Sequence, residues 1–311
     1  LRLFGRTDEL AVPAKHTKEK IMKANDLYEQ VTSQVLDLMD KHGSDWVKPW
    51  FEKSSNHNKY SKTLYSGFNI LATACSSMKQ GFESNEWATY NQWTKAGYSL
   101  KGAKGTAIMF WTMLERTVDG EKEKFPMAKV YHIFNAEQVV DYVPEADVDV
   151  SEFAVERVDN IVTNSGVKLT HGGNKACYMH APTDAIRMPK KSSFTGTDTS
   201  TAEECYSSTL LHELAHWTGA KSRLDRTKGK SFGDDAYAFE ELVAELSAVF
   251  SCARLDVSIQ PRADSAKYLN SWKTTLRDNP KAIQRACSLA QKATDYIMQY
   301  DTEVKLTREV A

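Results

Sequence analysis

Two histidines four residues apart, with a glutamate beside the first, are the residues of this chain best suited to metal chemistry. They are His212 and His216 in the stretch LLHELAHWTG, residues 210–219, with Glu213 between them. Positions i and i+4 of a helix share one face, about 5–6 Å apart, so both imidazoles can reach one zinc ion. Glu213 then stands where a base for a metal-bound water is needed. The alternative is an ordinary amphipathic helix that carries two histidines.

A third protein ligand separates these alternatives, because catalytic zinc usually takes three protein ligands and one water. The stretch YAFEELVAELSAVF, residues 237–250, has a helical pattern and carries Glu241 and Glu245 one turn apart. One carboxylate can bind the ion while the other orients a ligand histidine. Glu240 is the alternative ligand, although its direction differs by about 100°. A solvated acidic face would also explain these carboxylates, but the surrounding apolar residues leave little of this helix for solvent.

The chemistry expected of such a site is metal-dependent hydrolysis of a peptide bond, as in a zinc metallopeptidase of the HExxH type. Zinc lowers the pKa of its water, and Glu213 takes the proton so that hydroxide attacks a carbonyl. The developing oxyanion needs a partner, for which Tyr237 is the candidate; a place in the core is the alternative for this ring. The strand AIRMP, residues 185–189, is a candidate edge for an extended peptide.

The first half of the chain holds a second set of candidates, in which aromatic residues alternate with lysines over residues 44–71 and 84–105. Aromatic faces and lysines suit a single-stranded DNA groove, since bases stack at about 1–3 kcal/mol each while cations follow the phosphates. KGAKG, residues 101–105, is a flexible basic loop. Burial in a core is the alternative for any one tryptophan. The candidate DNA-binding residues are Trp46, Trp50, Lys59, Tyr65, Asn69, Trp87, Trp93, Lys101 and Lys104.

The elements that must position these residues fall on either side of an acidic, proline-containing seam at residues 139–153. A chain of 311 residues is long enough for two domains. We expect a DNA-binding domain over residues 20–140, a linker over 141–150 and a metallopeptidase domain over 151–300.

Both halves are predicted to be α+β, because each mixes helical and strand patterns. The first half shows a helix over 18–42, another near 66–79 and a hairpin of strands 106–115 and 126–134 around Asp119-Gly120. In the second half, a helix at 151–164 precedes short strands near 166–171, 176–181 and 185–189. Helices are then expected near residues 199–218, 236–254, 261–277 and 280–300.

Bulk properties narrow the class of protein. The net charge of -1 argues against a uniformly basic nucleic-acid coat but leaves room for a local basic face. Five widely spaced cysteines fit free thiols in a reducing compartment. The sequence shows neither an apolar run of about 18 residues nor a signal-peptide pattern, so we expect a cytoplasmic protein with no membrane partner.

Longer motifs stand in order through both halves. Those of the first half are DWVKPW (45–50), LYSGFNIL (64–71), EWATYNQW (86–93), GYSLKGAKG (97–105) and VYHIFNAEQV (130–139). Those of the second half are YMHAPTDAIRMP (178–189), YSSTLLHELAHWTGAKSRLDR (206–226) and FGDDAYAFEELVAEL (232–246). Together, over residues 24–300, they resemble the ArdC-type antirestriction proteins of conjugative plasmids.

The resemblance implies a single-stranded-DNA-binding domain joined to a zincin-like metallopeptidase domain, and protection of transferred plasmid DNA from restriction. It implies zinc, with manganese as the alternative, at His212, His216 and the Glu241 position. A likeness to gluzincin metallopeptidases makes Glu245 the supporting carboxylate. Two rival functions stay open: a non-proteolytic DNA-coating protein with a structural metal, and a regulatory metalloprotease that cuts a repressor.

Overall fold

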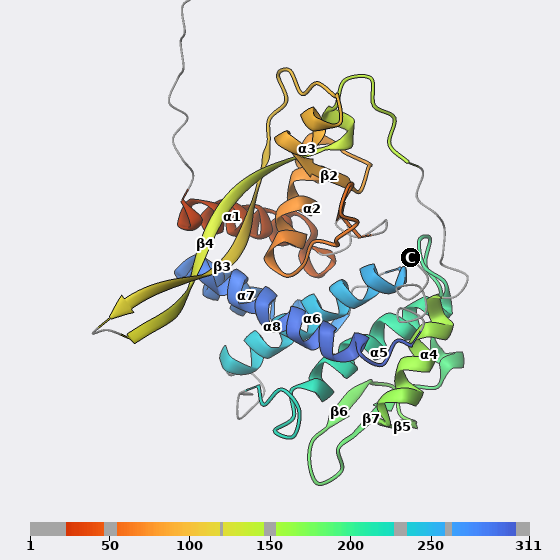
Figure 1. Cartoon of the computed structure of the whole chain (residues 1–311). Coiled ribbons are helices and arrows are strands. Elements are labelled where there is room, and N and C mark those ends of the chain that lie inside the picture. Colours follow the sequence, from red (N-terminus) through yellow and green to blue (C-terminus); the bar gives the residue numbers. More distant parts are fainter. Residues whose placement is uncertain are drawn as a thin grey trace, which may run out of the picture.

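The structure is a computed structural model that describes residues 23–46, 55–118, 121–145, 154–226, 235–258 and 263–302. It has two parts, each of which mixes helices with a small sheet (Figure 1). The predicted α+β class with two domains is therefore confirmed.

The N-terminal part is built on a sheet with the strand order β1-β2-β4-β3. Strands β3 and β4 form a long antiparallel hairpin that pairs Thr106 with Ile133 near its base, which confirms the predicted hairpin. The proposed turn, Asp119-Gly120, lies outside the described residues. Helix α1 packs one side of this part through apolar residues at helical spacing, among them Leu27, Val31 and Val35. The elements are α1 (Ala24–His42), β1 (His57–Asn58), α2 (Phe68–Gln80), β2 (Glu86–Thr89), α3 (Tyr90–Lys95), β3 (Thr106–Val118) and β4 (Glu121–Asn135).

The C-terminal part packs its helices beside a three-stranded sheet of order β5-β7-β6 (Figure 1). One expected helix, residues 261–277, is a 3-10 turn at Ala263–Lys267 followed by α7. The elements are α4 (Ala154–Ser165), β5 (Lys168–His171), β6 (Cys177–Met179), β7 (Ala185–Met188), α5 (Ala202–Thr218), α6 (Asp235–Leu255), α7 (Leu269–Asp278) and α8 (Lys281–Met298).

Strand β7 corrects one prediction. This strand is the centre of its sheet, parallel to β5 and antiparallel to β6, so both of its backbone edges are already paired. Three of its four residues are buried, as suits a central strand. An extended peptide therefore has no free edge on β7, and only β5 and β6 lie at the margins of this sheet.

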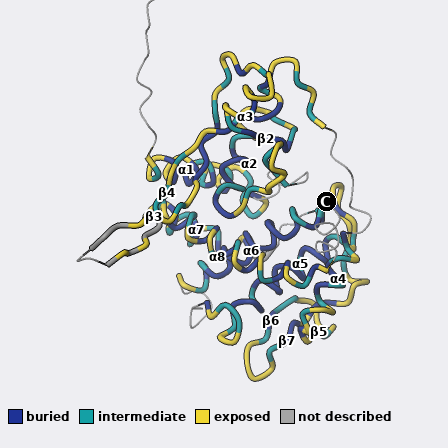
Figure 2. The backbone as a smooth tube through the Cα atoms, in the orientation of Figure 1, coloured by how far each residue is buried: buried dark blue, intermediate teal, exposed yellow. Residues whose placement is uncertain are grey.

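Helix α5, which carries both histidines, begins at a defined residue. Thr201 caps it: its hydroxyl accepts a hydrogen bond from the Glu204 amide at 3.1 Å, and the Glu204 carboxylate accepts one from the Thr201 amide at 2.7 Å. This capping box fixes the helix start and hence the direction in which later side chains point. The helix is buried along most of its length (Figure 2).

The two parts share a hydrophobic core. Helix α1 lies against α7 and α8, and the Thr32 hydroxyl donates to the Pro280 carbonyl at 2.9 Å. Trp46 meets Trp272 edge to face at 6.3 Å between ring centroids. The indole N–H of Trp272 donates to the Ala238 carbonyl of α6 at 2.6 Å. The N-terminal part is therefore packed on α7 and α8, and α7 in turn contacts α6, one of the two helices that build the candidate site.

Two further sequence-based expectations concern cysteines and membrane spans. All five cysteines are free thiols, as predicted, and four of them are buried. Among the described helices, none has the length and apolar character to cross a bilayer.

Candidate metal centre

Helices α5 and α6 bring His212, His216 and Glu241 to one point, with a ligand atom from each within 4.8 Å of the others. The two histidine Nε2 atoms are 3.1 Å apart. The Glu241 carboxylate lies 3.6 Å from Nε2 of His212 and 3.4 Å from Nε2 of His216. Two imidazole nitrogens and a carboxylate that face one point form a donor set that zinc and related divalent ions favour. The residues present therefore fit a divalent metal ion.

Each histidine also has a carboxylate at its other ring nitrogen. Glu245 lies 3.3 Å from Nδ1 of His212, and Glu240 lies 3.5 Å from Nδ1 of His216. Such partners fix the ring orientation and tautomer of metal-binding histidines. Glu245 therefore lies beside a candidate ligand histidine, in the supporting position that the sequence analysis predicts for it. Glu240, the alternative ligand in the sequence, supports His216 instead of meeting the ligand cluster.

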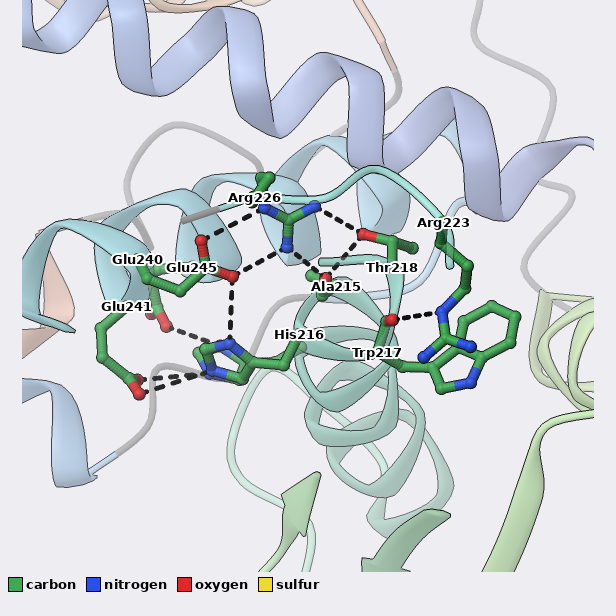
Figure 3. A network of polar contacts seen from close by, with 10 residues as sticks. Ala215, His216, Trp217, Thr218, Arg223, Arg226, Glu240, Glu241 and Glu245 are labelled. Carbon is green, nitrogen blue, oxygen red and sulfur yellow. Dashed lines mark hydrogen bonds and ion pairs between the residues drawn. The ribbon is translucent and has the colours of Figure 1, made fainter. Parts of the chain in front are cut away.

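Arg226, which follows α5, holds Glu240 in place (Figure 3). Its guanidinium donates to both Glu240 oxygens, at 3.2 and 2.8 Å, and to the Thr218 hydroxyl at 2.7 Å. A further bond goes to the Ala215 carbonyl at 2.5 Å. Arginine and glutamate are both buried, so the pair joins the end of α5 to α6 through a desolvated, two-pronged contact. Sequence reasoning missed Arg226, because the contact depends on the path of the loop and follows no spacing rule.

The pKa values in the cluster show that its carboxylates favour a positive charge at the point where the two histidines meet. Burial alone would lower the pKa of His216, but the carboxylates of Glu240 and Glu241 raise it to about 9. Burial would raise the pKa of Glu240, yet hydrogen bonds with His216 and Arg226 lower it to about 2. Both histidines likewise hold the pKa of Glu241 below its ordinary range, against the effect of burial. The metal-free site therefore keeps Glu240 and Glu241 ionised and holds a proton on His216, where an ion would bind.

Glu213 and Tyr237, the two predicted catalytic residues, lie on the same two helices. Glu213 is buried on α5, and its charge also raises the pKa of His216. Tyr237 is one turn before Glu241 on α6, and its ring is 5.8 Å from that of Tyr268. Burial and the charge of Glu241 raise the pKa of Tyr237, so its hydroxyl stays protonated at neutral pH and can donate a hydrogen bond.

Three of the four predicted DNA-stacking tryptophans are in the core, which corrects the sequence interpretation for them. Trp46, Trp87 and Trp93 are all fully buried. The indole N–H of Trp87 donates to Asn56 at 2.8 Å, and that of Trp93 donates to the Phe134 carbonyl at 3.2 Å. A base has no access to a ring whose faces are covered, so these three side chains pack the fold in this structure. Trp50 lies outside the described residues.

Three other candidate DNA contacts are also engaged within the protein. The Lys59 ammonium lies 2.7 Å from Glu86 and 2.5 Å from Glu145. Asn69 makes two hydrogen bonds, at 2.7 and 2.8 Å, with the backbone of Met109 in β3. Tyr65 is partly buried and packs against the hydrophobic core, and this burial raises its pKa to about 12. In this structure Lys59 and Asn69 make polar contacts within the domain, while Tyr65 and Asn69 also line a cavity of about 460 Å³.

Lys101 and Lys104 are exposed, as a phosphate contact requires. The structure also exposes aromatic residues that the sequence analysis did not select. Tyr90, Phe110, Trp111 and Tyr131 are 54%, 50%, 55% and 45% exposed. Tyr90 and Tyr131 belong to motifs singled out in the sequence, EWATYNQW and VYHIFNAEQV. Composition gave no signal that Tyr90 would be exposed while Trp93 in the same motif was buried.

Comparisons with known proteins match both parts of the chain. A model of the N-terminal domain of anti-restriction factor ArdC matches residues 25–134, and a zincin-like metallopeptidase model matches residues 156–289. The uncharacterized protein y4eC of Sinorhizobium fredii is 33% identical over 287 residues, which cover 88% of this chain and 91% of that protein. DNA primase TraC of Escherichia coli is 30% identical, but this chain spans only 27% of its length.

Solved structures agree with these matches. The metal-free structure of the antirestriction ArdC protein from plasmid R388 is 31% identical, with a TM-score of 0.72. The alignment covers 89% of this chain and 98% of that one. The Mn(II)-bound structure of the same protein matches with the same TM-score and 29% identity.

Proposed function

Because this chain belongs to the ArdC family of antirestriction proteins, we propose that it protects incoming DNA from restriction enzymes. In this proposal the unit over residues 20–140 binds single-stranded DNA. A linker over 141–150 joins it to a metal-dependent peptidase unit over 151–300, which cleaves a protein substrate.

His212, His216 and Glu241 would hold the ion, for which zinc suits the donor set. Manganese is the alternative, since the R388 protein was solved with Mn(II). When bound, the ion supplies a Lewis acid that acidifies water and polarises the substrate carbonyl. Glu240 and Glu245, each beside the Nδ1 atom of one histidine, would keep the two imidazoles oriented for metal binding.

The protein's own residues then move the protons. Glu213 removes a proton from the attacking water and returns it to the leaving amine, so that the amine departs as a neutral group. Tyr237 donates a hydrogen bond to the carbonyl oxygen as negative charge develops there. The position of Tyr237 one turn before Glu241 supports this role, and its phenol is protonated at neutral pH, as an ordinary tyrosine is.

The observation that carries the proposal is the convergence of His212, His216 and Glu241 from two helices, with a separate carboxylate behind each imidazole. A pair of histidines on an ordinary amphipathic helix would need none of these partners. Three protein ligands would leave a position for water on a bound ion, as in catalytic zinc sites.

The test is Glu213→Gln, which removes the base and keeps the shape of the side chain. We expect this variant to bind the metal ion as the wild type does, but to lose both substrate cleavage and protection of incoming DNA in a transfer assay. Glu203→Gln, an exposed change on the same helix, is the matched control and should leave both unchanged. Full protection by Glu213→Gln would rule out proteolysis as the mechanism.

A second candidate function follows from that last outcome. The protein would then shield DNA by coating single strands, with the ion in a structural role. The exposed lysines of the loop at residues 101–105 favour this candidate, because they can contact phosphate without the metal centre.

A further inference from the structure

We infer that single-stranded DNA lies in one particular groove of the N-terminal part; this inference rests on the proposed DNA-binding function. The lysine groove, as we name it, has a volume of about 1070 Å³. Helices α1 and α2 form one wall, and the loop at residues 101–105 with the base of the β3–β4 hairpin forms the other. Small-molecule pockets usually measure about 300–1,000 Å³, so this groove is as large as the largest of them.

The charge of the lysine groove suits a polyanion. Lys79 of α2 and Lys104 line it, and Lys101 is exposed on the same loop as Lys104. Among the described residues that line the groove, none is an aspartate or a glutamate. None of these three lysines makes an ion pair with a described residue, whereas Lys59 and Lys62 pair with Glu145 elsewhere in this part. The groove therefore offers cations whose charge is not neutralised by the described part of the protein.

Aromatic rings in the same groove favour a single strand over a duplex. Tyr90 is 54% exposed, and its ring meets the half-buried ring of Phe134 edge to face at 6.2 Å. The exposed side chain of His132 lies beside them. Bases can stack on such rings only when their faces are free, which is the case in a single strand.

The groove is also held in shape before any ligand arrives. The Lys104 carbonyl accepts a hydrogen bond from Gln138 at 3.0 Å, which ties the lysine loop to the domain. Gly105 allows the loop to lie close to the hairpin, because a Cβ there would stand 3.0 Å from both His132 and Phe134. Tyr90 is the first residue of α3, and Thr89 caps the start of this helix. The Thr89 hydroxyl accepts a hydrogen bond from the Gln92 amide at 3.2 Å. A preformed groove loses less conformational entropy on binding.

The experiment measures fluorescence anisotropy of a short labelled oligo-thymidine strand with the full-length protein over a salt series. The double variant Lys79→Gln/Lys104→Gln should bind at least about tenfold more weakly at low salt. It should also flatten the slope of log affinity against log salt by about 1.4, or about 0.7 for each phosphate that a lysine no longer neutralises. Tyr90→Ala should weaken binding by about 5- to 140-fold, as expected when one base can no longer stack.

Lys62→Gln is the matched control, because it removes one charge from the same part but outside the groove. Thermal melts establish that each variant is folded. If the wild type and all groove variants bind the strand equally, the groove assignment is wrong while the proposed DNA binding stands. If the wild type itself shows no binding at low salt, both are wrong. Tighter binding of a matching oligo-uridine strand would replace DNA by RNA as the partner.

Discussion

The metal centre and the lysine groove balance their charges in opposite ways. At the metal centre, buried Glu240 is matched by Arg226, and Glu241 lies between two histidines. In the groove, Lys79 and Lys104 are exposed and pair with no described carboxylate. Buried charges need partners inside the protein, while exposed charges are solvated. The charges of the metal centre are therefore already paired within the folded protein, whereas the lysines of the groove are free to pair with a ligand.

The largest effect is expected from breaking a buried charge pair. Arg226→Met removes the guanidinium that bonds both oxygens of the buried Glu240 carboxylate and leaves it only the contact with His216 among those described. We expect the free energy of unfolding to fall by about 3–5 kcal/mol. The corresponding change in the groove, Lys104→Met, should alter it by no more than about 0.5 kcal/mol, because Lys104 is exposed and pairs with no described carboxylate. Urea denaturation of both variants measures the difference. Equal destabilisation would contradict the contrast between the two regions.

A smaller effect is expected when a supporting carboxylate is neutralised. Glu245→Gln keeps the shape of the side chain at 3.3 Å from Nδ1 of His212 but removes its charge. Changes of this kind typically lower metal affinity about 10- to 100-fold. Competition with a metal chelator measures the affinity, with Glu203→Gln on α5 as the control. An unchanged affinity in Glu245→Gln would show that Glu245 does not support the site.

Acidification should also weaken metal binding, and the loss of affinity should grow steadily as the pH is lowered. In the metal-free protein the pKa of His216 is raised to about 9, so below that pH an ion must displace a proton from this ring. Affinity should therefore fall by about tenfold for each unit of pH lowered from pH 8. Chelator competition at several pH values checks the sign and the slope. Affinity that rises on acidification would contradict the assignment of His216 as a ligand.

The metal centre was largely predictable from the sequence because its spacing is local. His212 and His216 share a helix face whatever the rest of the fold does, and so do Glu241 and Glu245. The pairing of Arg226 with Glu240 could not be foreseen, since it depends on how the chain returns from α5 to α6. The same holds for β7, whose central place in its sheet is set by neighbouring strands and not by its own four residues.

The N-terminal part shows where composition stops being informative. Trp93 and Tyr90 stand three residues apart in one motif, yet the first is fully buried and the second is 54% exposed. Both are aromatic and both are near lysines, so only the direction of α3 against the sheet distinguishes them. Strand β2 escaped prediction for a related reason. Three of its four residues are buried, so it shows no alternation of apolar and polar side chains.

The most direct measurement of the central claim is a calorimetric titration of the chelator-treated full-length protein with zinc, repeated with manganese. The wild type should bind one ion per chain, and Glu241→Ala should lose most of that binding, because one of three protein ligands is gone. Glu203→Ala, exposed on the neighbouring helix, should titrate as the wild type does. No uptake of either ion by the wild type, or equal uptake by Glu241→Ala, would contradict the account.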